Sequence, residues 1–275
     1  MPNDQRVYWN QTSGDAWVDL QPLLDRLYEG IGKAVVDHAF PGEGKRALDI
    51  GCGAGATTLA MARRLGPRGA AVGLDLSKPL LELARSRAAR EGLASARFQE
   101  GDAQIADLGE EPFDALVSRF GVMFFSDFDA AFTHLRAAAR PGAQLAFACW
   151  RSAADNAKVL APVAAALRLL PPVPPSDPDA PGRFAFARAE RVKGILERSG
   201  WHRIAIEPLD VTEPATVDEI VTMSTRLGTL GPLLPAQGPA LRQAVDRAMR
   251  DLLEPLAEDG RVEVPSACWL VTARA

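Results

Sequence analysis

From Arg46 onward the chain alternates short apolar runs with helical patterns, and this rhythm constrains the fold more than any other feature. The first unit, RALDI (Arg46 to Ile50), is a predicted strand that runs into glycines and then into a predicted helix over 56–65. Apolar strands that alternate with helices of about ten to fifteen residues are typical of repeated βα units around a parallel sheet. The sequence therefore predicts an α/β fold with a doubly wound, mostly parallel sheet.

Further units continue this pattern as far as Trp150. Ser77 is expected to cap the second helix, and Pro141 with Gly142 is expected to separate the next helix from the strand that follows it. The predicted strands cover 70–75, 96–100, 112–118 and 143–150, and the predicted helices cover 77–92 and 128–140.

The flanks differ from this core. Predicted helices over 17–27 and 31–40 precede the first strand, and a proline-rich loop covers 171–182. After residue 150 the other expected elements are helices over 155–170, 189–199 and 239–256 and strands over 201–207 and 266–273. We expect one domain over 1–275, with a helical lid at 1–40, a ligand-binding core at 41–150, and insertions that cover the site, with the last two strands, at 151–275.

Composition excludes several classes of protein. With 275 residues, 47% of them hydrophobic, the chain is long enough to bury a sizeable core. The net charge of −4 argues against binding to nucleic acid, which needs a basic surface. No apolar run reaches the roughly 18 residues of a membrane span and no secretory signal is visible, so we expect a cytoplasmic protein. Cys52, Cys149 and Cys268 have no CxxC spacing, which favours reduced thiols and argues against structural zinc.

The stretch ALDIGCGAGATT, residues 47–58, is the most informative motif. A strand runs into Gly51, Gly53 and Gly55 and then into a helix, so a ligand can approach the backbone and the amides at the helix start. Gly51, Gly53 and Ala56 also satisfy the GxGxxG/A fingerprint of dinucleotide-binding proteins. The motif alone indicates a nucleotide-type loop without fixing the ligand.

Asp49 lies at the mouth of this loop, where a dinucleotide would place its pyrophosphate. At about 5 Å and an effective dielectric near 20, a contact between unit charges is worth roughly 3 kcal/mol. That energy opposes a pyrophosphate and favours an ammonium or sulfonium, so the loop is predicted to prefer a positively charged nucleoside. The alternative is that the Asp49 carboxylate only caps amides of the loop itself.

Two more aspartates follow strands of the same predicted sheet. Asp75 comes 24 residues after Gly51, near the spacing of about 20 expected for a carboxylate that accepts both ribose hydroxyls. Asp102, in EGDAQ, can accept a hydrogen bond from an adenine amino group. Each alone is equally compatible with an aspartate in a turn at a strand end. Together at one edge of the sheet, they favour a ligand-binding function.

These motifs, in the order LDIGCGAG, VGLDLS, GDAQ, FDALVSRFGVMFF and LRAAARPGAQLAF, resemble the class I S-adenosylmethionine-dependent methyltransferases over Arg46 to Trp150. Within that class the chain is most similar to the bacterial group that resembles ubiquinone and menaquinone C-methyltransferases. The resemblance implies a Rossmann-like seven-stranded fold with an antiparallel last strand near 269–272. It also implies S-adenosylmethionine as the cofactor, a small-molecule acceptor, and no metal.

The resemblance also implies roles for individual residues. Asp49 would lie near the methionine ammonium, Gly51 and Gly53 would face the ligand with Cys52 packed beneath it, and Asp75 would bind the ribose. The other implied cofactor contacts are Leu76 on the adenine, Asp102 with Ala103 at the adenine edge, Ser118 beside the methionine moiety, and Tyr8 and Trp9 in a lid motif. Aromatic packing within a helical flank is an equally good explanation of Tyr8 and Trp9.

An acceptor should lie near the end of the fourth strand. No general base stands out there, and His38, His134 and His202 are interpreted as structural, so no catalytic residue is assigned. Arg119 follows that strand and is expected either to bind an acidic acceptor or to pair with Asp127 or Asp129. The expected apolar wall of the acceptor site is Phe120, Met123 and Trp150, with Phe124, although Met123 and Phe124 are also compatible with plain core packing.

The predicted function is thus methyl transfer from S-adenosylmethionine to a small molecule by in-line displacement. Two alternatives stay open. One is an NAD(P)-dependent oxidoreductase on a Rossmann-like fold, which Asp49 and the absence of a recognisable Tyr/Lys or His catalytic set disfavour. The other is a non-catalytic protein that binds S-adenosylmethionine. The sequence identifies neither the acceptor nor the oligomeric state.

Overall fold

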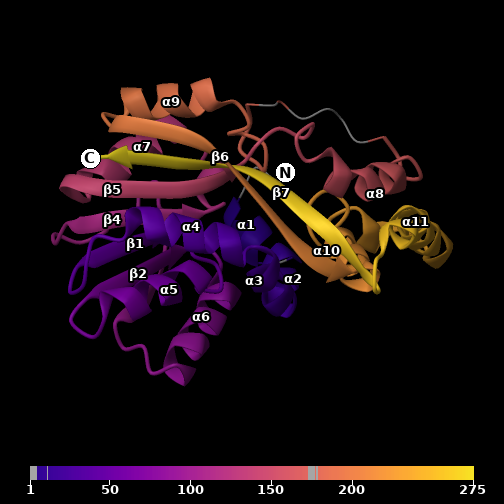
Figure 1. Ribbon diagram of the computed structural model, residues 1–275, viewed down its shortest axis with the longest axis horizontal. Coiled ribbons are helices and arrows are strands. Elements are labelled where there is room, and N and C mark those ends of the chain that lie inside the picture. Colours follow the sequence, from indigo (N-terminus) through magenta and orange to yellow (C-terminus); the bar gives the residue numbers. More distant parts are fainter. Residues whose placement is uncertain (1–4, 11, 173–176, 178) are drawn as a thin grey trace.

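The computed structural model describes residues 5–10, 12–172, 177 and 179–275, and its centre is one seven-stranded sheet in the order β3-β2-β1-β4-β5-β7-β6 (Figure 1). The predicted doubly wound α/β fold is confirmed. The strands are β1 (Arg46–Ile50), β2 (Ala70–Asp75), β3 (Ala96–Glu100), β4 (Phe113–Arg119), β5 (Ala139–Trp150), β6 (His202–Thr216) and β7 (Arg261–Arg274).

The sheet reverses its winding between β1 and β4. Strands β1 to β5 pair in parallel, and β7 pairs antiparallel with both β5 and β6, as expected for the last strand. The strand order runs outward from β1 to β2 and β3 on one side and from β4 to β5 on the other. In open α/β sheets, ligands bind outside the carboxyl ends of the strands at such a reversal. The topology therefore directs attention to the ends of β1 and β4.

Helices cover both faces of this sheet, and α4 lies in front of it in Figure 1 while α7 lies behind it. The helices are α1 (Gln5–Asn10), α2 (Thr12–Asp19), α3 (Gln21–Leu27), α4 (Glu29–Ala39), α5 (Ala56–Leu65), α6 (Lys78–Arg90), α7 (Phe128–Ala137), α8 (Ala157–Leu167), α9 (Ala189–Arg198), α10 (Val217–Arg226) and α11 (Pro239–Leu253), with 3-10 turns η1 (Val122–Phe124), η2 (Leu234–Ala236) and η3 (Glu254–Leu256).

Strand β5 begins earlier than predicted. Pro141 and Gly142 were expected to end the preceding helix and open the strand, but the structure includes both in β5, which starts at Ala139. Ala139 pairs with Phe113, and the register shifts before Gln144 pairs with Ala115. The proline is tolerated because it lies in this exposed, irregular beginning of the strand, where the regular ladder has not started.

Strands β6 and β7 are also longer than the predicted 201–207 and 266–273. They pair from His202 with Arg274 to Thr216 with Arg261, and so form a ribbon that leaves the main sheet towards the right of Figure 1. The extension was not predicted because β6 is half-exposed and contains Pro208 and Pro214. The structure tolerates both prolines because β6 is an edge strand.

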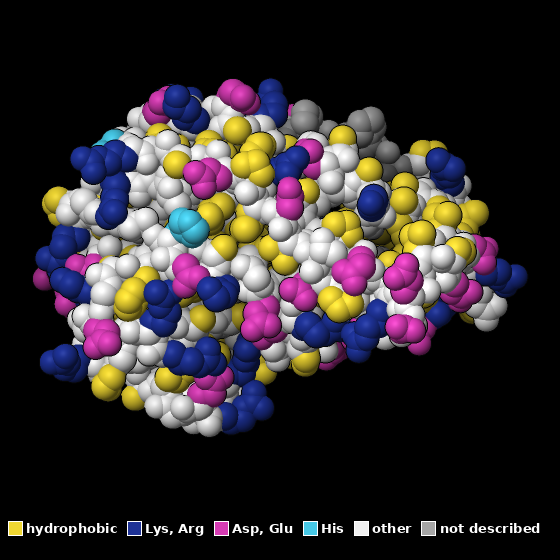
Figure 2. Space-filling view, in the orientation of Figure 1, with side chains coloured by type: hydrophobic (Ala, Val, Ile, Leu, Met, Phe, Trp, Pro, Cys, Tyr) yellow, Lys and Arg dark blue, Asp and Glu magenta, His cyan; other side chains and the backbone are white. Residues whose placement is uncertain are grey.

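The far end of this ribbon has a hydrophobic core of its own. Side chains from α3, α8, α10, α11 and the ribbon form it, separately from the core around the sheet. The helix α10, which the sequence analysis did not predict, begins with a capping box of Thr216 and Glu219. On the face drawn in Figure 2, acidic and basic side chains are interspersed over both parts of the molecule.

The amino-terminal helices are divided differently from the prediction. The expected helix over 17–27 is divided between α2 and α3, which are separated at Leu20, and α4 follows directly after Tyr28. The break is consistent with Pro22, because a proline is tolerated in the first turn of a helix and disrupts its interior. No helix in the described part of the chain is long and apolar enough to cross a membrane.

Candidate functional site

The ends of β1 and β4 touch backbone to backbone. A Cβ atom added to Gly51, whose φ is +65°, would lie 2.7 Å from Cα of Gly121. The Ser118 hydroxyl joins the same two ends, because it donates to the carbonyl of Ile50 at 2.7 Å and accepts from the Gly121 amide at 3.1 Å. Ser118, which was expected beside the methionine moiety, is buried in this structure and links the ends of β1 and β4.

Asp49 is buried at the bottom of this junction, with only 2% of its surface exposed. Its Oδ2 accepts hydrogen bonds of 2.6 Å from the hydroxyls of Thr57 and Thr58 on α5, and not from amides of the loop. Its Oδ1 is buried and has no partner among the described residues. A buried carboxylate oxygen without a donor is costly unless a cation or donor meets it.

The environment of Asp49 also changes its titration. Burial raises the pKa of Asp49 to about 6, while the hydroxyls of Thr57 and Thr58 and the nearby Arg119 act in the opposite direction. The neighbouring charge of Asp75 adds to the upward shift of the pKa. A bound cation would favour the ionised form and reverse this shift. The residue therefore fits the positively charged end of a ligand.

Asp75 holds the glycine loop and the loop after β2 together. Its Oδ2 accepts from the Gly53 amide at 2.7 Å, and its Oδ1 accepts from the Ser77 amide at 2.8 Å. Burial raises the pKa of Asp75. Cys52 is buried beneath the loop, where a Cβ added to Gly73 would lie 2.8 Å from its sulfur, in line with the expected small packed residue.

Helix α1 lies over the loop that follows Asp75. Asn10 donates to the carbonyl of Leu76 at 2.8 Å and accepts from the Lys78 amide at 2.9 Å, and the Ser77 hydroxyl donates to the carbonyl of Trp9 at 2.8 Å. Ser77 is the N-cap residue of α6, as expected, but its hydroxyl makes no capping hydrogen bond, because it bonds to α1. The ring of Trp9 meets Phe124 edge-on at 5.6 Å. The side chain of Tyr8 lies outside the described residues.

Asp102 lies beyond β3 at the same edge of the sheet. Gln104 bonds to its carboxylate through both the backbone amide, at 3.0 Å, and the side-chain amide, at 3.1 Å. Gln104 in turn accepts from the Ser126 amide at 2.8 Å, which ties the loop to the segment after η1. Ala103 is buried beside them. The predicted cofactor residues after β1, β2 and β3 thus share one edge of the sheet.

Arg119 turns back toward the amino-terminal helices. Its Nη2 lies 3.8 Å from Oδ1 of Asp25 on α3, and Asp25 also pairs with Arg87 at 2.5 Å. The suggested partners Asp127 and Asp129 are wrong, because Asp127 caps α7 and Asp129 pairs with Arg198. Burial lowers the pKa of Arg119, while Asp25 and Asp49 act in the opposite direction. Arg119 is thus within the electrostatic reach of Asp49.

Tyr28, Phe120 and Trp150 form an aromatic cluster beside this junction. Phe120 stacks on Trp150 with ring centroids 4.7 Å apart and an interplanar angle of 8°, and Tyr28 meets both rings edge-on. Phe120 has a φ of +69°, which is strained for a bulky residue. Met123, also expected in the acceptor wall, is 1% exposed and belongs to the main core.

The remaining candidate groups have structural surroundings. His38 and His134 bond to the carbonyls of Ala34 and Ala106, at 2.8 and 2.9 Å. The three cysteines are buried without a disulfide, as predicted. Burial raises the pKa of the Cys149 thiol well above its ordinary range. Among the residues that the structure describes, no cluster of His, Cys, Asp and Glu could hold a metal ion.

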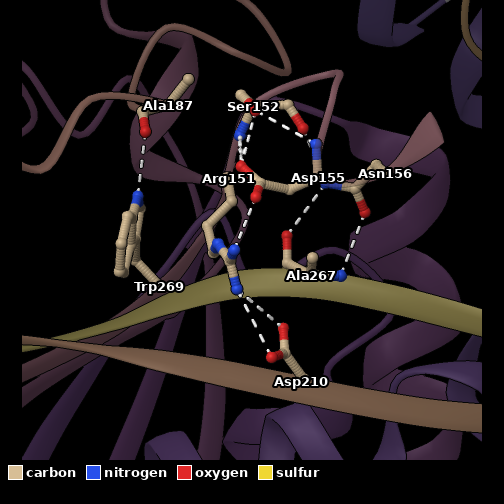
Figure 3. A network of polar contacts seen from close by, with 8 residues as sticks. All are labelled: Arg151, Ser152, Asp155, Asn156, Ala187, Asp210, Ala267 and Trp269. Carbon is tan, nitrogen blue, oxygen red and sulfur yellow. Dashed lines mark hydrogen bonds and ion pairs between the residues drawn. The ribbon is translucent and has the colours of Figure 1, made fainter.

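A polar network connects the end of β5 to the ribbon (Figure 3). Arg151 pairs with Asp155 at 2.6 Å and with Asp210 of β6 at 3.0 Å. Asn156 donates to the carbonyl of Ala267 and accepts from its amide, both at 3.0 Å. The network fixes the corner after Trp150 against β6 and β7, and so holds one wall of the site in place.

Sequence reasoning missed Asp25, Tyr28 and Arg183, all of which lie close to the aromatic cluster or to Arg119. Asp25 and Tyr28 belong to the amino-terminal helices, and Arg183 follows the proline-rich loop. No motif connects these segments to β4, because only the folded chain brings them together. An arginine beside two phenylalanines at 183–186 was the one available signal.

Comparisons with known proteins agree with the fold and the motifs. Residues 47–142 match a family described as "Methyltransferase domain". An uncharacterised protein of Mycobacterium tuberculosis is 30% identical over 65% of this chain and 61% of its own length. Demethylmenaquinone methyltransferase of Thermus thermophilus is 34% identical over 41% of this chain and 50% of its own. The chain thus spans less than two thirds of each of these relatives.

Solved structures of methyltransferases share the fold of this chain. A SAM-dependent methyltransferase from Aquifex aeolicus superposes with a TM-score of 0.53 at 15% identity, over 94% of this chain and 97% of that one. The fold and the edge-of-sheet loops define a Rossmann-like domain of the methyltransferase type. The part of the chain over 47–142 therefore matches a methyltransferase domain, and the chain as a whole is similar in fold to solved S-adenosylmethionine-dependent methyltransferases.

Proposed function

We propose that this protein transfers a methyl group from S-adenosylmethionine to a small-molecule acceptor. The observation that carries the proposal is the unpartnered Oδ1 of Asp49, a buried carboxylate oxygen at the end of β1 that lacks the cation it would need. The zwitterionic amino-acid end of the cofactor supplies such a cation as its α-ammonium. The cytoplasm is the proposed compartment, on the sequence grounds given above.

The residues of the site fit the methionine, ribose and adenine parts of this cofactor. Asp49 would hold the ammonium, Gly51 and Gly53 would allow close approach to the backbone, and Asp75 would accept the ribose hydroxyls in place of one loop amide. Leu76, Asp102 and Ala103 would surround the adenine. Helix α1 is bonded to the loop after β2 through Trp9 and Asn10, which supports its proposed role as the lid.

Two alternatives are less well supported. A dinucleotide would place its pyrophosphate near Asp49, and the buried carboxylate, already short of a positive partner, repels it. A non-catalytic ligand-binding protein would need no acceptor wall, whereas strained Phe120 directly follows β4 and stacked Trp150 is the last residue of β5. Strain of this kind in a bulky residue concentrates at functional sites.

When bound, S-adenosylmethionine supplies a methyl group on a sulfonium, which is a good leaving group, so the protein mainly has to align and enclose the reactants. The glycine junction fixes the ends of β1 and β4 relative to one another. The lid helix and the aromatic cluster would exclude water from the space between them. The insertions over 151–275 would cover the acceptor.

Arg119 has two possible roles that a single variant separates. Its position near Asp49 favours contact with the carboxylate of the cofactor, while the sequence suggested an acidic acceptor. If it serves the cofactor, Arg119→Met should weaken S-adenosylhomocysteine binding about tenfold, the usual scale for one charge-assisted bond. Calorimetry checks this. An unchanged affinity together with a raised acceptor KM would assign Arg119 to the acceptor.

The test of the proposed function is calorimetric titration with S-adenosylhomocysteine. The wild-type protein should bind it with micromolar affinity, and Asp75→Ala should abolish detectable binding, because the ribose hydroxyls lose their acceptor. Asp107→Ala is the matched control, since Asp107 is an exposed loop residue that accepts from the Gly109 amide. A wild-type protein that does not bind the compound at all would contradict the proposal.

A further inference from the structure

Arg183 differs from every other arginine that lies over an aromatic ring in the described part of the chain. Five of these arginines also pair with a carboxylate, and Arg183 has no ion-pair or hydrogen-bond partner among the described residues. The five pairs are Arg46 with Glu111, Arg64 with Asp37, Arg119 with Asp25, Arg151 with Asp155, and Arg191 with Asp179.

The guanidinium of Arg183 lies on the aromatic cluster. Its Cζ is 4.0 Å from the centroid of the Trp150 ring, on which Phe120 also stacks. Its Nε is fully buried without a hydrogen-bond partner, and the residue as a whole is half-buried. Contact with an aromatic face stabilises a cation but satisfies none of the five N–H donors of a guanidinium.

The segment that carries Arg183 is anchored on both sides. The Gly182 amide donates to the carbonyl of Met123 at 2.9 Å. The indole of Trp269 donates to the carbonyl of Ala187 at 3.0 Å, as Figure 3 shows. Between them, Phe186 is completely buried against the rings of Phe128, Phe132 and Phe147. The backbone of Arg183 is therefore fixed beside the cluster, unlike that of an arginine on a free loop.

The other arginines beside the cluster have carboxylate partners. Arg119 shares Asp25 with Arg87, and Arg151 is paired with Asp155 and Asp210, whereas Arg183 has no carboxylate partner among the described residues. Cys268 and Tyr28 also face it, and both have raised pKa values because they are buried, which keeps them neutral. The Tyr28 hydroxyl forms no hydrogen bond with the described residues and is a free donor there.

We propose that the acceptor is a planar aromatic acid whose ring packs against the cluster of Tyr28, Phe120 and Trp150 and whose carboxylate binds Arg183. A guanidinium presents two parallel N–H donors that match a carboxylate. Half-buried Tyr28, with the buried pair of Phe120 and Trp150 behind it, provides an aromatic wall against which a flat ring can pack. This assignment rests on the proposed methyltransferase function and adds the chemical class of the acceptor to it.

The experiment measures the affinity of matched acids and amides for the protein saturated with S-adenosylhomocysteine. The probes are benzoate, 2-naphthoate and anthracene-2-carboxylate, each paired with its neutral carboxamide, which has nearly the same shape. At least one acid should bind wild-type protein ten times or more tightly than its amide. Arg183→Met should remove this preference while leaving the affinity for the amide and for S-adenosylhomocysteine unchanged.

Two further variants sharpen the test. Arg191→Met is the matched control, because Arg191 also lies over a ring, that of Phe128, but is paired with Asp179, and it should keep the preference for acids. Arg183→Lys keeps the charge without the two parallel donors and should retain part of the preference.

The outcomes separate this proposal from the one on which it rests. If S-adenosylhomocysteine binds but no acid is preferred over its amide, or the preference survives in Arg183→Met, the assignment of Arg183 is overturned and the methyltransferase proposal stands. If S-adenosylhomocysteine does not bind wild-type protein, both proposals fall.

Discussion

Asp49→Asn should abolish tight binding of S-adenosylhomocysteine and at the same time make the ligand-free protein more stable at pH 7.5. The amide has almost the same shape as the carboxylate but lacks the charge that the α-ammonium of the ligand needs. A loss of about 3 kcal/mol in binding, or roughly a hundredfold or more in affinity, is expected for a buried charge pair that loses one partner.

The gain in stability follows from the titration of Asp49. Burial raises its pKa from 3.8 to about 6, so the folded protein resists the ionised form that the unfolded chain prefers. At pH 7.5 the ionised carboxylate destabilises the ligand-free fold by roughly 3 kcal/mol, and the amide removes most of that cost. Because the penalty shrinks as the pH falls from 6 towards 3.8, the variant's advantage should be smaller at pH 5.

Thermal unfolding at pH 7.5 and pH 5 measures this advantage, and calorimetry measures the binding. Binding to the wild-type protein should weaken as the pH falls through about 6, whereas the residual binding to Asp49→Asn should lack this step. Asp114→Asn is a contrasting control, because Asp114 accepts from Arg140 at 2.9 Å and should lose stability at pH 7.5. An Asp49→Asn protein that binds normally would show that the carboxylate does not face the ligand.

Gly121→Ala should destabilise the protein by about 3 kcal/mol or more. A methyl group at this position would lie 2.5 Å from the carbonyl oxygen of Ile50 and 2.8 Å from Cα of Gly51, both of which are backbone atoms that cannot rotate away. The ends of β1 and β4 would have to separate, at a cost like that of overpacking a core. For a chain of this size, the melting temperature should fall by about 6 to 12 °C.

Gly238→Ala is the matched control for this variant. Gly238 precedes α11, has ordinary backbone angles, and has nothing within 4 Å of an added Cβ atom. Its alanine variant should melt within a degree or two of the wild type. The account of the junction would be wrong if Gly121→Ala melted like Gly238→Ala, because the contact between β1 and β4 would then tolerate the extra methyl group.

The sequence predicted the parts of this fold that local patterns encode. The helix at Ala56–Leu65 and the strands β1, β2 and β3 lie where apolar runs and glycines placed them, because each of these elements is bounded by its own turn residues. The strand β5 and the ribbon of β6 and β7 were underestimated. Their prolines read as breaks, and only the sheet shows that they lie where a missing N–H is tolerated.

In the candidate site too, some contacts could be predicted from the sequence and others could not. Asp49 and Asp75 lie at the ends of β1 and β2, and Asp102 follows β3. Because the carboxyl ends of parallel strands share one edge of the sheet, the proximity of these aspartates could be predicted. The pairing of Arg119 with Asp25 and the position of Arg183 on Trp150 depend on the packing of α3 and of the segment after the proline-rich loop. No periodicity encodes those contacts, which are set by tertiary structure alone.

The most direct measurement is a crystal structure of the protein with S-adenosylhomocysteine. The account predicts the α-ammonium against Asp49, the ribose hydroxyls against Asp75, the adenine between Leu76 and Asp102, and the sulfur facing the cluster of Tyr28, Phe120 and Trp150. A ligand bound elsewhere, or bound at this edge with its ammonium away from Asp49, would contradict the central claim that the buried carboxylate at the end of β1 selects a cationic nucleoside.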